Sequence, residues 1–264
     1  MNFFQAIILG IVQGVTEFLP VSSSGHLVLL KHLFDIEEVP ILFDVLLHVS
    51  TLMVVIIVFR QRIMKLFVSL GRFITRKNDK SDVNNLRLIW VIIVATALTA
   101  VVGYSVSLLE ISQKPKIVSA LFIVTAAILV SSYYARGKKN YRELTWKEGA
   151  FTGLAQGLGV FPGISRSGIT ISASLHAGIE REKAGEYAFL ISIPAVLGAL
   201  ILSLNDAQAL ADVSSPLVVL SGIAASFIVG LASLLLLLML VRKAKLYLFA
   251  LYLVPMGVAG LIIF

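Results

Sequence analysis

Long apolar stretches alternate with short polar segments along the chain, and their lengths predict membrane-spanning helices. A helix needs about 20 mostly apolar residues to cross a bilayer. Five windows clearly meet this requirement: 88–109, 117–134, 187–204, 216–241 and 246–264. A sixth window, Ile41–Phe59, also qualifies, although it contains Asp44 and His48. The pattern therefore predicts an all-α integral membrane protein.

Two further apolar regions are interrupted by residues that break helices. Residues 3–34 are broken at Leu19-Pro20 and by the serines that follow, and residues 149–176 are broken at Phe161-Pro162-Gly163. Each half is too short to span, and Pro and Gly end a helix or bend it. Each region could be one kinked spanning helix. We favour the alternative, a re-entrant helical hairpin that returns to the side it entered.

The distribution of Lys and Arg favours two hairpins. With both regions re-entrant, segments 60–87, 136–147, 181–183 and 242–245 lie on one side and carry eight, five, two and three Lys or Arg residues. Segments 31–38, 110–116 and 205–215 then lie on the other side with one, two and none. The side rich in Lys and Arg is cytoplasmic. We therefore expect both termini outside, since a single full span would split the basic segments between the two sides.

The two broken regions also resemble each other. Residues 10–25 read GIVQGVTEFLPVSSSG and residues 153–168 read GLAQGLGVFPGISRSG, with seven of sixteen positions identical at an offset of 143. We therefore expect one membrane domain over 1–264 built from two repeats, 1–135 and 148–264. Each repeat is a hairpin followed by three spans, and because three is odd the second repeat must be inverted. Inverted repeats with broken helices place their site near the midplane, where the tips meet.

Composition agrees with a membrane protein and excludes several other classes. The chain is 58% hydrophobic and 14% charged, whereas soluble proteins carry about 25% charged residues. The net charge of +7 follows from the basic segments between spans, so no nucleic-acid partner is expected. The absence of Cys rules out disulfides and thiolate metal sites. No Lys or Arg precedes Lys31, so we expect no cleaved signal peptide.

The two predicted hairpin tips carry polar and ionisable residues. The first tip offers an amide, a carboxylate, three hydroxyls and an imidazole, from Gln13, Glu17, Ser22, Ser23, Ser24 and His26. Gln13 and Glu17 share a helix face, and one of the serines should cap the next helix. The second tip offers Ser165 as the expected cap, followed by Arg166, Ser167 and Thr170.

Together the tips provide the groups that bind phosphate: helix N-termini, hydroxyls and a guanidinium. A carboxylate beside a phosphate would repel it, so Glu17 implies either a bridging divalent cation or a proton-transfer role. The small residues could instead serve packing alone, and Arg166 could simply neutralise Glu17. However, each ionisable group inside a bilayer costs roughly 2.5–3.5 kcal/mol. Three of them in two related turns favour a functional site.

The segments GVTEFLPVSSSGHL (14–27) and FPGISRSGITIS (161–172) resemble the two signature motifs of the undecaprenyl-pyrophosphate phosphatase family, membrane enzymes linked to bacitracin resistance. The resemblance covers the whole chain, including GEYAFLISIPA (185–195). It implies hydrolysis of a polyprenyl diphosphate to the monophosphate and inorganic phosphate, which recycles the lipid carrier of peptidoglycan synthesis. It also implies a divalent cation, Mg²⁺ or Ca²⁺, and an active site open to the outer face of the bacterial plasma membrane.

The resemblance assigns roles to individual residues. Glu17 matches the essential glutamate, Ser23 and His26 match the catalytic serine and histidine, and Arg166 matches the phosphate-binding arginine. Whether Ser23 or His26 attacks phosphorus stays open. The family pattern is Glu-x-x-x-Glu, but the first position here is Gln13. A neutral amide supplies neither a base nor anionic charge, so metal binding and base chemistry fall on Glu17.

Other functions remain to be weighed. A transporter or flippase of polyprenyl phosphate or another anion is the main alternative, because inverted repeats are common among transporters. A carrier needs Arg and N–H groups, but not a nucleophile with an acid or base. A purely structural membrane protein leaves the clustered ionisable groups unexplained. The expected partners are the polyprenyl diphosphate and membrane lipids. The sequence leaves open the oligomeric state, with a homodimer as one alternative, and whether Asp44 supports the site.

Overall fold

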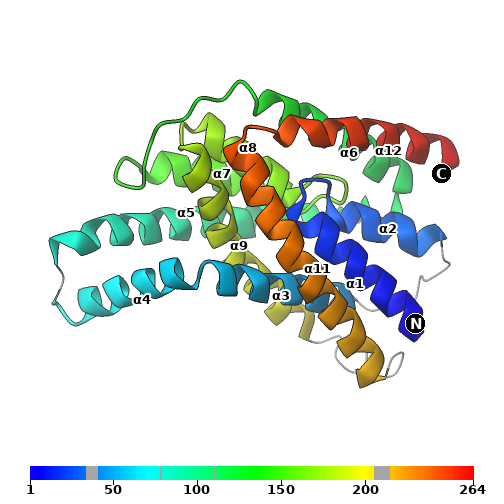
Figure 1. The fold of residues 1–264 in the computed structure, drawn as a ribbon, viewed down its shortest axis with the longest axis horizontal. Helices are drawn as coiled ribbons and strands as arrows, with labels where there is room; N and C mark the ends of the chain where they lie inside the picture. Colours follow the sequence, from blue (N-terminus) through cyan, green and yellow to red (C-terminus); the bar gives the residue numbers. More distant parts are fainter. Residues whose placement is uncertain (34–40, 78, 110, 205–214) are drawn as a thin grey trace.

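The described part of the chain is built from α-helices and short 3₁₀ turns (Figure 1). The computed structural model describes residues 1–33, 41–77, 79–109, 111–204 and 215–264. The first half contains α1 (Phe3–Phe18), α2 (Ser23–Leu33), α3 (Ile41–Val58), α4 (Arg60–Ile74), α5 (Val83–Ser107) and α6 (Pro115–Ser131). The second half contains α7 (Trp146–Leu158), α8 (Arg166–His176), α9 (Arg181–Ser203), α11 (Pro216–Arg242) and α12 (Ala250–Ile263). The 3₁₀ turns are η1 (Lys80–Asp82), η2 (Ile111–Gln113) and η4 (Leu246–Phe249).

Five helical segments are long and apolar enough to cross a membrane, which makes the chain a multi-pass membrane protein. They are Ile41–Val58, Lys80–Ser107, Arg181–Ser203, Pro216–Arg242 and Leu246–Ile263. Five of the six predicted windows are therefore confirmed as helices long and apolar enough to span. In the sixth, 117–134, the structure has the apolar helix α6 of 17 residues, which ends at Ser131.

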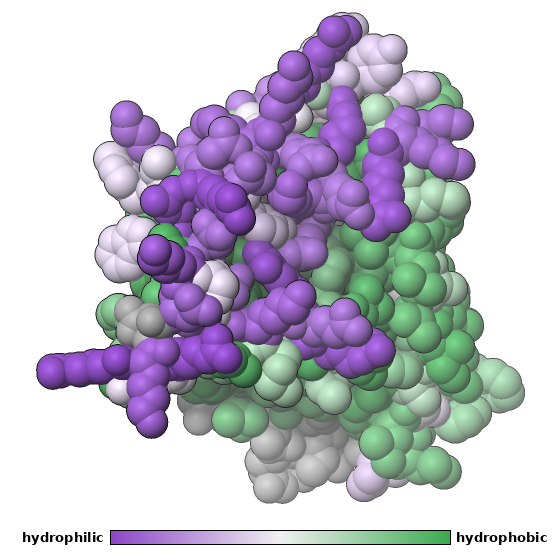
Figure 2. Space-filling model, turned by 60° about the vertical axis from the view of Figure 1, so that its left-hand side comes forward, coloured by the Kyte–Doolittle hydropathy of each residue, from purple (hydrophilic) through white to green (hydrophobic). Residues whose placement is uncertain are grey.

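Hydrophilic side chains gather at one end of the molecule, and apolar side chains cover the adjoining flank (Figure 2). This end contains most of α4, its connection to α5, and residues 136–147. The exposed basic side chains in these segments and after α11 are Arg60, Lys65, Arg72, Arg76, Lys77, Lys80, Arg136, Lys138, Arg142, Lys147, Arg242, Lys243 and Lys245. Such an asymmetry matches a protein with one cytoplasmic end. Of the segments predicted to lie opposite, residues 34–38, 110 and 205–214 fall outside the described residues.

The segment 60–87 contains a helix that the sequence analysis did not predict. Helix α4 follows α3 after a single residue, and only Leu66 and Ser69 of its side chains are buried. Phe67 and Phe73 are exposed on the same helix as its basic residues. A helix of this composition is typical of the boundary between bilayer and water.

Both predicted helix breaks are confirmed. Helix α1 ends at Phe18, two residues before Pro20, and α7 ends at Leu158, before Phe161-Pro162-Gly163. The turns use left-handed backbone at Ser22 (φ 70°) and Gly163 (φ 99°). The start of α1 and the end of α2 lie at the same side of the molecule (Figure 1). This is the arrangement of a hairpin and not of one kinked span.

The two halves of the chain are interleaved. Helix α1 packs mainly on α11, α7 on α5, and α12 on α6. Glycines at repeat-related positions permit the first two contacts: an ideal Cβ would lie 2.2 Å from Gly222 O at Gly10 and 2.5 Å from Ala95 O at Gly153. An ideal Cβ at Gly14 would lie 2.7 Å from Ser226 O of α11, and one at Gly157 would lie 2.5 Å from Val102 Cβ of α5. The repeated glycines therefore bring each hairpin against a span of the other half. The inversion of one half relative to the other stays a prediction.

The beginning of α7 is fixed by a polar cluster at the hydrophilic end. Thr145 caps the helix, and its backbone N–H donates to Glu148 Oε2 over 2.7 Å. Lys139 Nζ donates to Glu148 Oε1 over 2.7 Å. Burial alone would raise the pKa of Glu148, but the hydrogen bonds from Lys139 and Thr145 lower it to about 2. The carboxylate therefore stays charged and fixes the first turn of α7, where the second hairpin begins.

Candidate active site

The two hairpin tips meet through hydrogen bonds between a serine side chain of each tip and a backbone group of the other. Gly163 N donates to Ser22 Oγ over 3.0 Å, and Ser167 Oγ donates to Phe18 O over 3.3 Å. An ideal Cβ at Gly25 would lie 2.8 Å from Gly163 N, so the first tip also needs a glycine at this contact. Exposed backbone groups are not tolerated in lipid. Each tip therefore satisfies part of the other's unpaired backbone.

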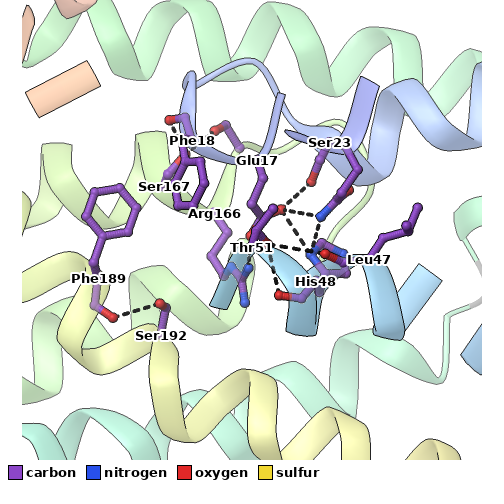
Figure 3. A network of polar contacts seen from close by, with 12 residues as sticks. Glu17, Phe18, Ser23, Leu47, His48, Thr51, Arg166, Ser167, Phe189 and Ser192 are labelled. Atoms are coloured by element: carbon purple, nitrogen blue, oxygen red, sulfur yellow. Dashed lines mark hydrogen bonds and ion pairs between the residues drawn. The ribbon is translucent and has the colours of Figure 1, made fainter. Parts of the chain in front are cut away.

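The carboxylate of Glu17 is the centre of a polar network between the tips (Figure 3). Its Oε2 accepts hydrogen bonds from Ser23 Oγ at 2.6 Å and from Gln13 Nε2 at 3.1 Å. The same oxygen lies 3.0 Å from His48 Nδ1. Its Oε1 forms an ion pair with the guanidinium of Arg166. Only 11% of the Glu17 side chain is exposed, so its charge depends on these partners.

Ser23 is presented to Glu17 by the turn between α1 and α2. The left-handed conformation of Ser22 ends the turn, and α2 begins at Ser23. Ser22 Oγ accepts a hydrogen bond from Gly25 N over 3.4 Å, as a helix cap does. A hydroxyl that donates to a carboxylate over 2.6 Å has the geometry of a nucleophile paired with its base.

Arg166 comes from the start of α8 in the second tip. Ser165 caps this helix as predicted, since its Oγ accepts from Gly168 N over 3.1 Å. The Arg166 side chain, 22% exposed, reaches across to Glu17. In the structure Arg166 neutralises the charge of Glu17, which is the alternative role that the sequence left open for it. The same guanidinium also lines both neighbouring cavities, where it can meet an anion.

Two cavities adjoin the Glu17–Arg166 pair. The larger has a volume of about 190 Å³ and the smaller about 20 Å³. The polar lining of the larger cavity comes from Thr16, Glu17, Ser23, Ser24, His48, Ser165 and Arg166. Its apolar lining comes from Val45, Val160, Ile164, Val196 and Ala199, next to Gly159. A cavity lined by both charged and apolar side chains suits a ligand that joins an anionic head to a hydrocarbon chain.

The remaining predicted phosphate-binding residues divide between the cavities. Ser24 and Ser165 line the larger one, whereas Ser167 and Thr170 line the smaller one. Thr170 Oγ1 is buried without a hydrogen-bond partner among the described residues, and so is Oε1 of Gln156 in the same small cavity. Ser22 serves the contact between the tips and lines neither cavity.

His26 is near the site but belongs to a different set of contacts. Its Nδ1 lies 2.8 Å from Ser22 O, and its Nε2 lies 2.7 Å from the hydroxyl of Tyr252. The ring stacks on Tyr252 and packs against Phe122. Within the described residues, no hydrogen bond joins His26 to Glu17, Ser23 or Arg166. Its visible contacts hold the turn that presents Ser23.

Asp44 does not take part in the Glu17 network. Its Oδ2 forms an ion pair with Lys31 Nζ over 2.7 Å, which ties α3 to the end of α2. Sequence reasoning missed two other residues, His48 and Tyr252, because each lies in an apolar span far from either motif. His48 carried a weak signal as an ionisable residue inside a predicted span. Nothing local showed which face of α3 it occupies.

The donor set around Glu17 limits how a metal ion could bind. No group of three or more His, Cys, Asp or Glu side chains comes together within the described segments. Both oxygens of Glu17 are engaged, and most of the surrounding groups are N–H or O–H donors. These residues do not fit a cation held by protein ligands alone. They fit a cation held jointly by one carboxylate and the phosphate oxygens of a substrate, as Mg²⁺ often is.

Comparison with known proteins places the chain in one family. The family model described as bacitracin resistance protein BacA matches residues 6–259. A protein of Treponema denticola named undecaprenyl-diphosphatase is 50% identical over 257 residues, covering 97% of this chain and 96% of the relative. Proteins with the same name from Borrelia recurrentis and Desulforapulum autotrophicum are 41% and 40% identical. They cover 96% and 99% of this chain, and 96% and 98% of the relatives.

Proposed function

The chain belongs to the bacitracin resistance protein BacA family, and we propose that it hydrolyses undecaprenyl diphosphate to undecaprenyl phosphate and inorganic phosphate. Relatives that carry the name of this activity match it over nearly their whole length. The observation that carries the proposal is the pairing of Ser23 with one oxygen of Glu17 and of Arg166 with the other. The carboxylate that can act as the base thus contacts both a nucleophile and an anion-binding group.

Binding begins with an exchange of partners at Arg166. The diphosphate competes with Glu17 for the guanidinium, which binds phosphate oxygens through two parallel N–H donors. As Arg166 turns to the phosphate, Glu17 Oε1 loses its partner while Oε2 keeps its hydrogen bond from Ser23. The substrate thereby converts a neutralised carboxylate into an available base.

Ser23 then attacks the terminal phosphorus. Its Oγ forms a bond to phosphorus, its proton passes to Glu17 Oε2, and the bond from phosphorus to the bridging oxygen breaks. Undecaprenyl phosphate leaves with the bridging oxygen. Water hydrolyses the phosphoserine in a second displacement, which returns the Ser23 proton and releases inorganic phosphate. We assign His26 the positioning of the turn, since its ring contacts Ser22 O and Tyr252.

The cavity and the metal complete the proposal. Val45, Val160 and Val196 in the lining of the larger cavity would receive the first part of the prenyl chain while the head faces Arg166. Glu17 Oε1, once free, is the ligand that would hold Mg²⁺ or Ca²⁺ together with the diphosphate. Such a cation neutralises phosphate charge and polarises the phosphoryl oxygens.

The proposed location is the bacterial plasma membrane, with the site open to the outer face. Exposed Lys and Arg gather at one end of the molecule, which we assign to the cytoplasm (Figure 2). Val45 lies early in α3, which leads into the basic helix α4, and Ala199 lies late in α9, which begins at Arg181. Both positions are on the parts of their helices away from the basic end. Hydrolysis there would recycle the lipid carrier of peptidoglycan synthesis.

Phosphorus NMR of purified protein with undecaprenyl diphosphate tests the reaction itself. We expect inorganic phosphate and undecaprenyl phosphate to appear in equal amounts. Intact diphosphate that only changes leaflet in sealed vesicles would contradict a hydrolase and support the transporter alternative.

A further inference from the structure

His48 joins the site from a third element, outside both hairpin tips. It lies in the spanning helix α3, and its Nδ1 is 3.0 Å from Glu17 Oε2 and 2.8 Å from Gln13 Nε2 (Figure 3). Its side chain is 23% exposed and lines both cavities. The two hairpins alone therefore do not complete the surroundings of the carboxylate.

The orientation of the Gln13 amide is fixed by its neighbours. Gln13 is fully buried, and its Nε2 donates to Glu17 Oε2 over 3.1 Å. The opposite orientation would place its carbonyl oxygen against the carboxylate, so that two acceptors would face each other. Gln13 Oε1 has no hydrogen-bond partner among the described residues. The amide is therefore held from its nitrogen side, by Glu17 and, where Nδ1 of His48 carries no proton, by His48 as well.

Nδ1 of His48 faces two neighbours and can form a hydrogen bond with only one of them at a time, but either bond restrains the Glu17 carboxylate. With a proton on Nδ1, the ring donates to Glu17 Oε2. Without it, Nδ1 accepts from Gln13 Nε2, which itself donates to Glu17. In both cases α3 is connected to the oxygen that accepts the hydrogen bond of Ser23 over 2.6 Å.

We propose that His48 is a positioning residue, which holds the Glu17 carboxylate through Oε2 in the orientation that Ser23 requires. The inference rests on the proposed hydrolysis at Ser23. In this chain the residue at position 13 is a neutral Gln, which supplies no charge, so Gln13 and His48 hold the carboxylate together. When the substrate draws Arg166 away from Oε1, the hydrogen bond of Gln13 and the link to His48, either direct or through Gln13, remain at Oε2 and keep the carboxylate from rotating away from Ser23.

Three substitutions at His48 separate positioning from simple packing. In His48→Asn, the amide Nδ2 and Oδ1 stand at the same bond distance from the backbone as Nδ1 and can contact both Glu17 and Gln13. In His48→Gln, the amide is one bond further out, and in His48→Leu there is no polar group. Misplacement of a reacting group by about 1 Å can cost about 100-fold in rate.

We therefore expect kcat for undecaprenyl diphosphate to fall about 100-fold in His48→Leu. It should fall nearly as far in His48→Gln, whereas His48→Asn should stay within about fivefold of the original chain. KM should change by less than about threefold in all three. The matched control is Ser50→Ala, which removes the hydrogen bond from α3 to Ile223 O and leaves Glu17 untouched. It should keep the original kcat.

Each outcome decides the proposal. Full kcat in His48→Leu would overturn it, and so would equal losses in the Asn, Gln and Leu variants, which would show a role for ring volume only. A change confined to KM would point to a binding contact and also overturn it. If His48→Leu fails to fold, the contrast between the Asn and Gln variants still decides. Lack of hydrolysis by the original chain would instead contradict the proposed function, and this inference with it.

Discussion

Gly163 N donates a hydrogen bond to Ser22 Oγ over 3.0 Å, although 141 residues separate them in the chain. Both residues have left-handed backbone, with φ values of 99° and 70°. Each lies in the turn between the two helices of a hairpin, inside an apolar region where unpaired backbone groups are costly. The contact explains how two incomplete hairpins form one stable centre around Glu17 and Arg166.

Replacing Gly163 tests the contact between the tips. In Gly163→Ala the left-handed backbone costs about 1–2 kcal/mol for a residue with a Cβ. The new atom would also lie 2.3 Å from Val118 O. We expect a lower Tm in detergent and a loss of hydrolysis. Gly71→Ala is the control, because a Cβ there meets nothing within 4 Å. An unchanged Tm and activity in Gly163→Ala would contradict this account of the tips.

Arg166→Lys tests the recognition of phosphate. Lys keeps the positive charge but cannot offer two parallel donors to a phosphate. We expect kcat/KM for undecaprenyl diphosphate to fall about 100-fold, the scale of losing one well-placed donor at a reaction centre. Arg242→Lys should have no effect, since Arg242 forms an exposed ion pair with Glu182. Full activity in Arg166→Lys would mean that only its charge matters.

Single cysteines in this cysteine-free chain test the orientation in the membrane. Ser81 lies next to the basic helix α4, and Ser215 directly precedes α11. We expect an impermeant thiol reagent added to intact cells to label Ser215→Cys and to leave Ser81→Cys unmodified. Opening the cells should then expose Ser81→Cys. Labelling of Ser81→Cys alone in intact cells would reverse the proposed orientation.

The backbone of the site could be predicted from sequence because its signals are local. Pro20 and Pro162 interrupt apolar runs, and Ser165 sits one residue before a new helix, so the breaks and the second cap were accessible. The meeting of the tips followed from the cost of leaving Glu17 and Arg166 unpaired in lipid. Short-range helix rules and the properties of the bilayer are enough to predict these features.

Contacts between distant helices were not accessible in the same way. The position of His48 beside Glu17 depends on the rotation and depth of α3, which the apolar pattern of that helix does not define. The hydrogen bond from His26 to Tyr252 was equally hidden, because Tyr252 comes from α12, 226 residues further along the chain. Helix α4 was missed because its many basic residues resemble a loop between spans.

Glu17→Gln is the most direct test of the central claim, that one carboxylate between the two tips carries the reaction. The amide keeps the size of the side chain but cannot accept the proton of Ser23 as a carboxylate does. We predict that phosphate release from undecaprenyl diphosphate by the purified variant falls about 1000-fold, within the range for loss of a general base. The variant should keep the elution profile of the folded protein, and Glu182→Gln, from an exposed ion pair, should keep full activity. Turnover by Glu17→Gln close to that of the original chain would contradict the account.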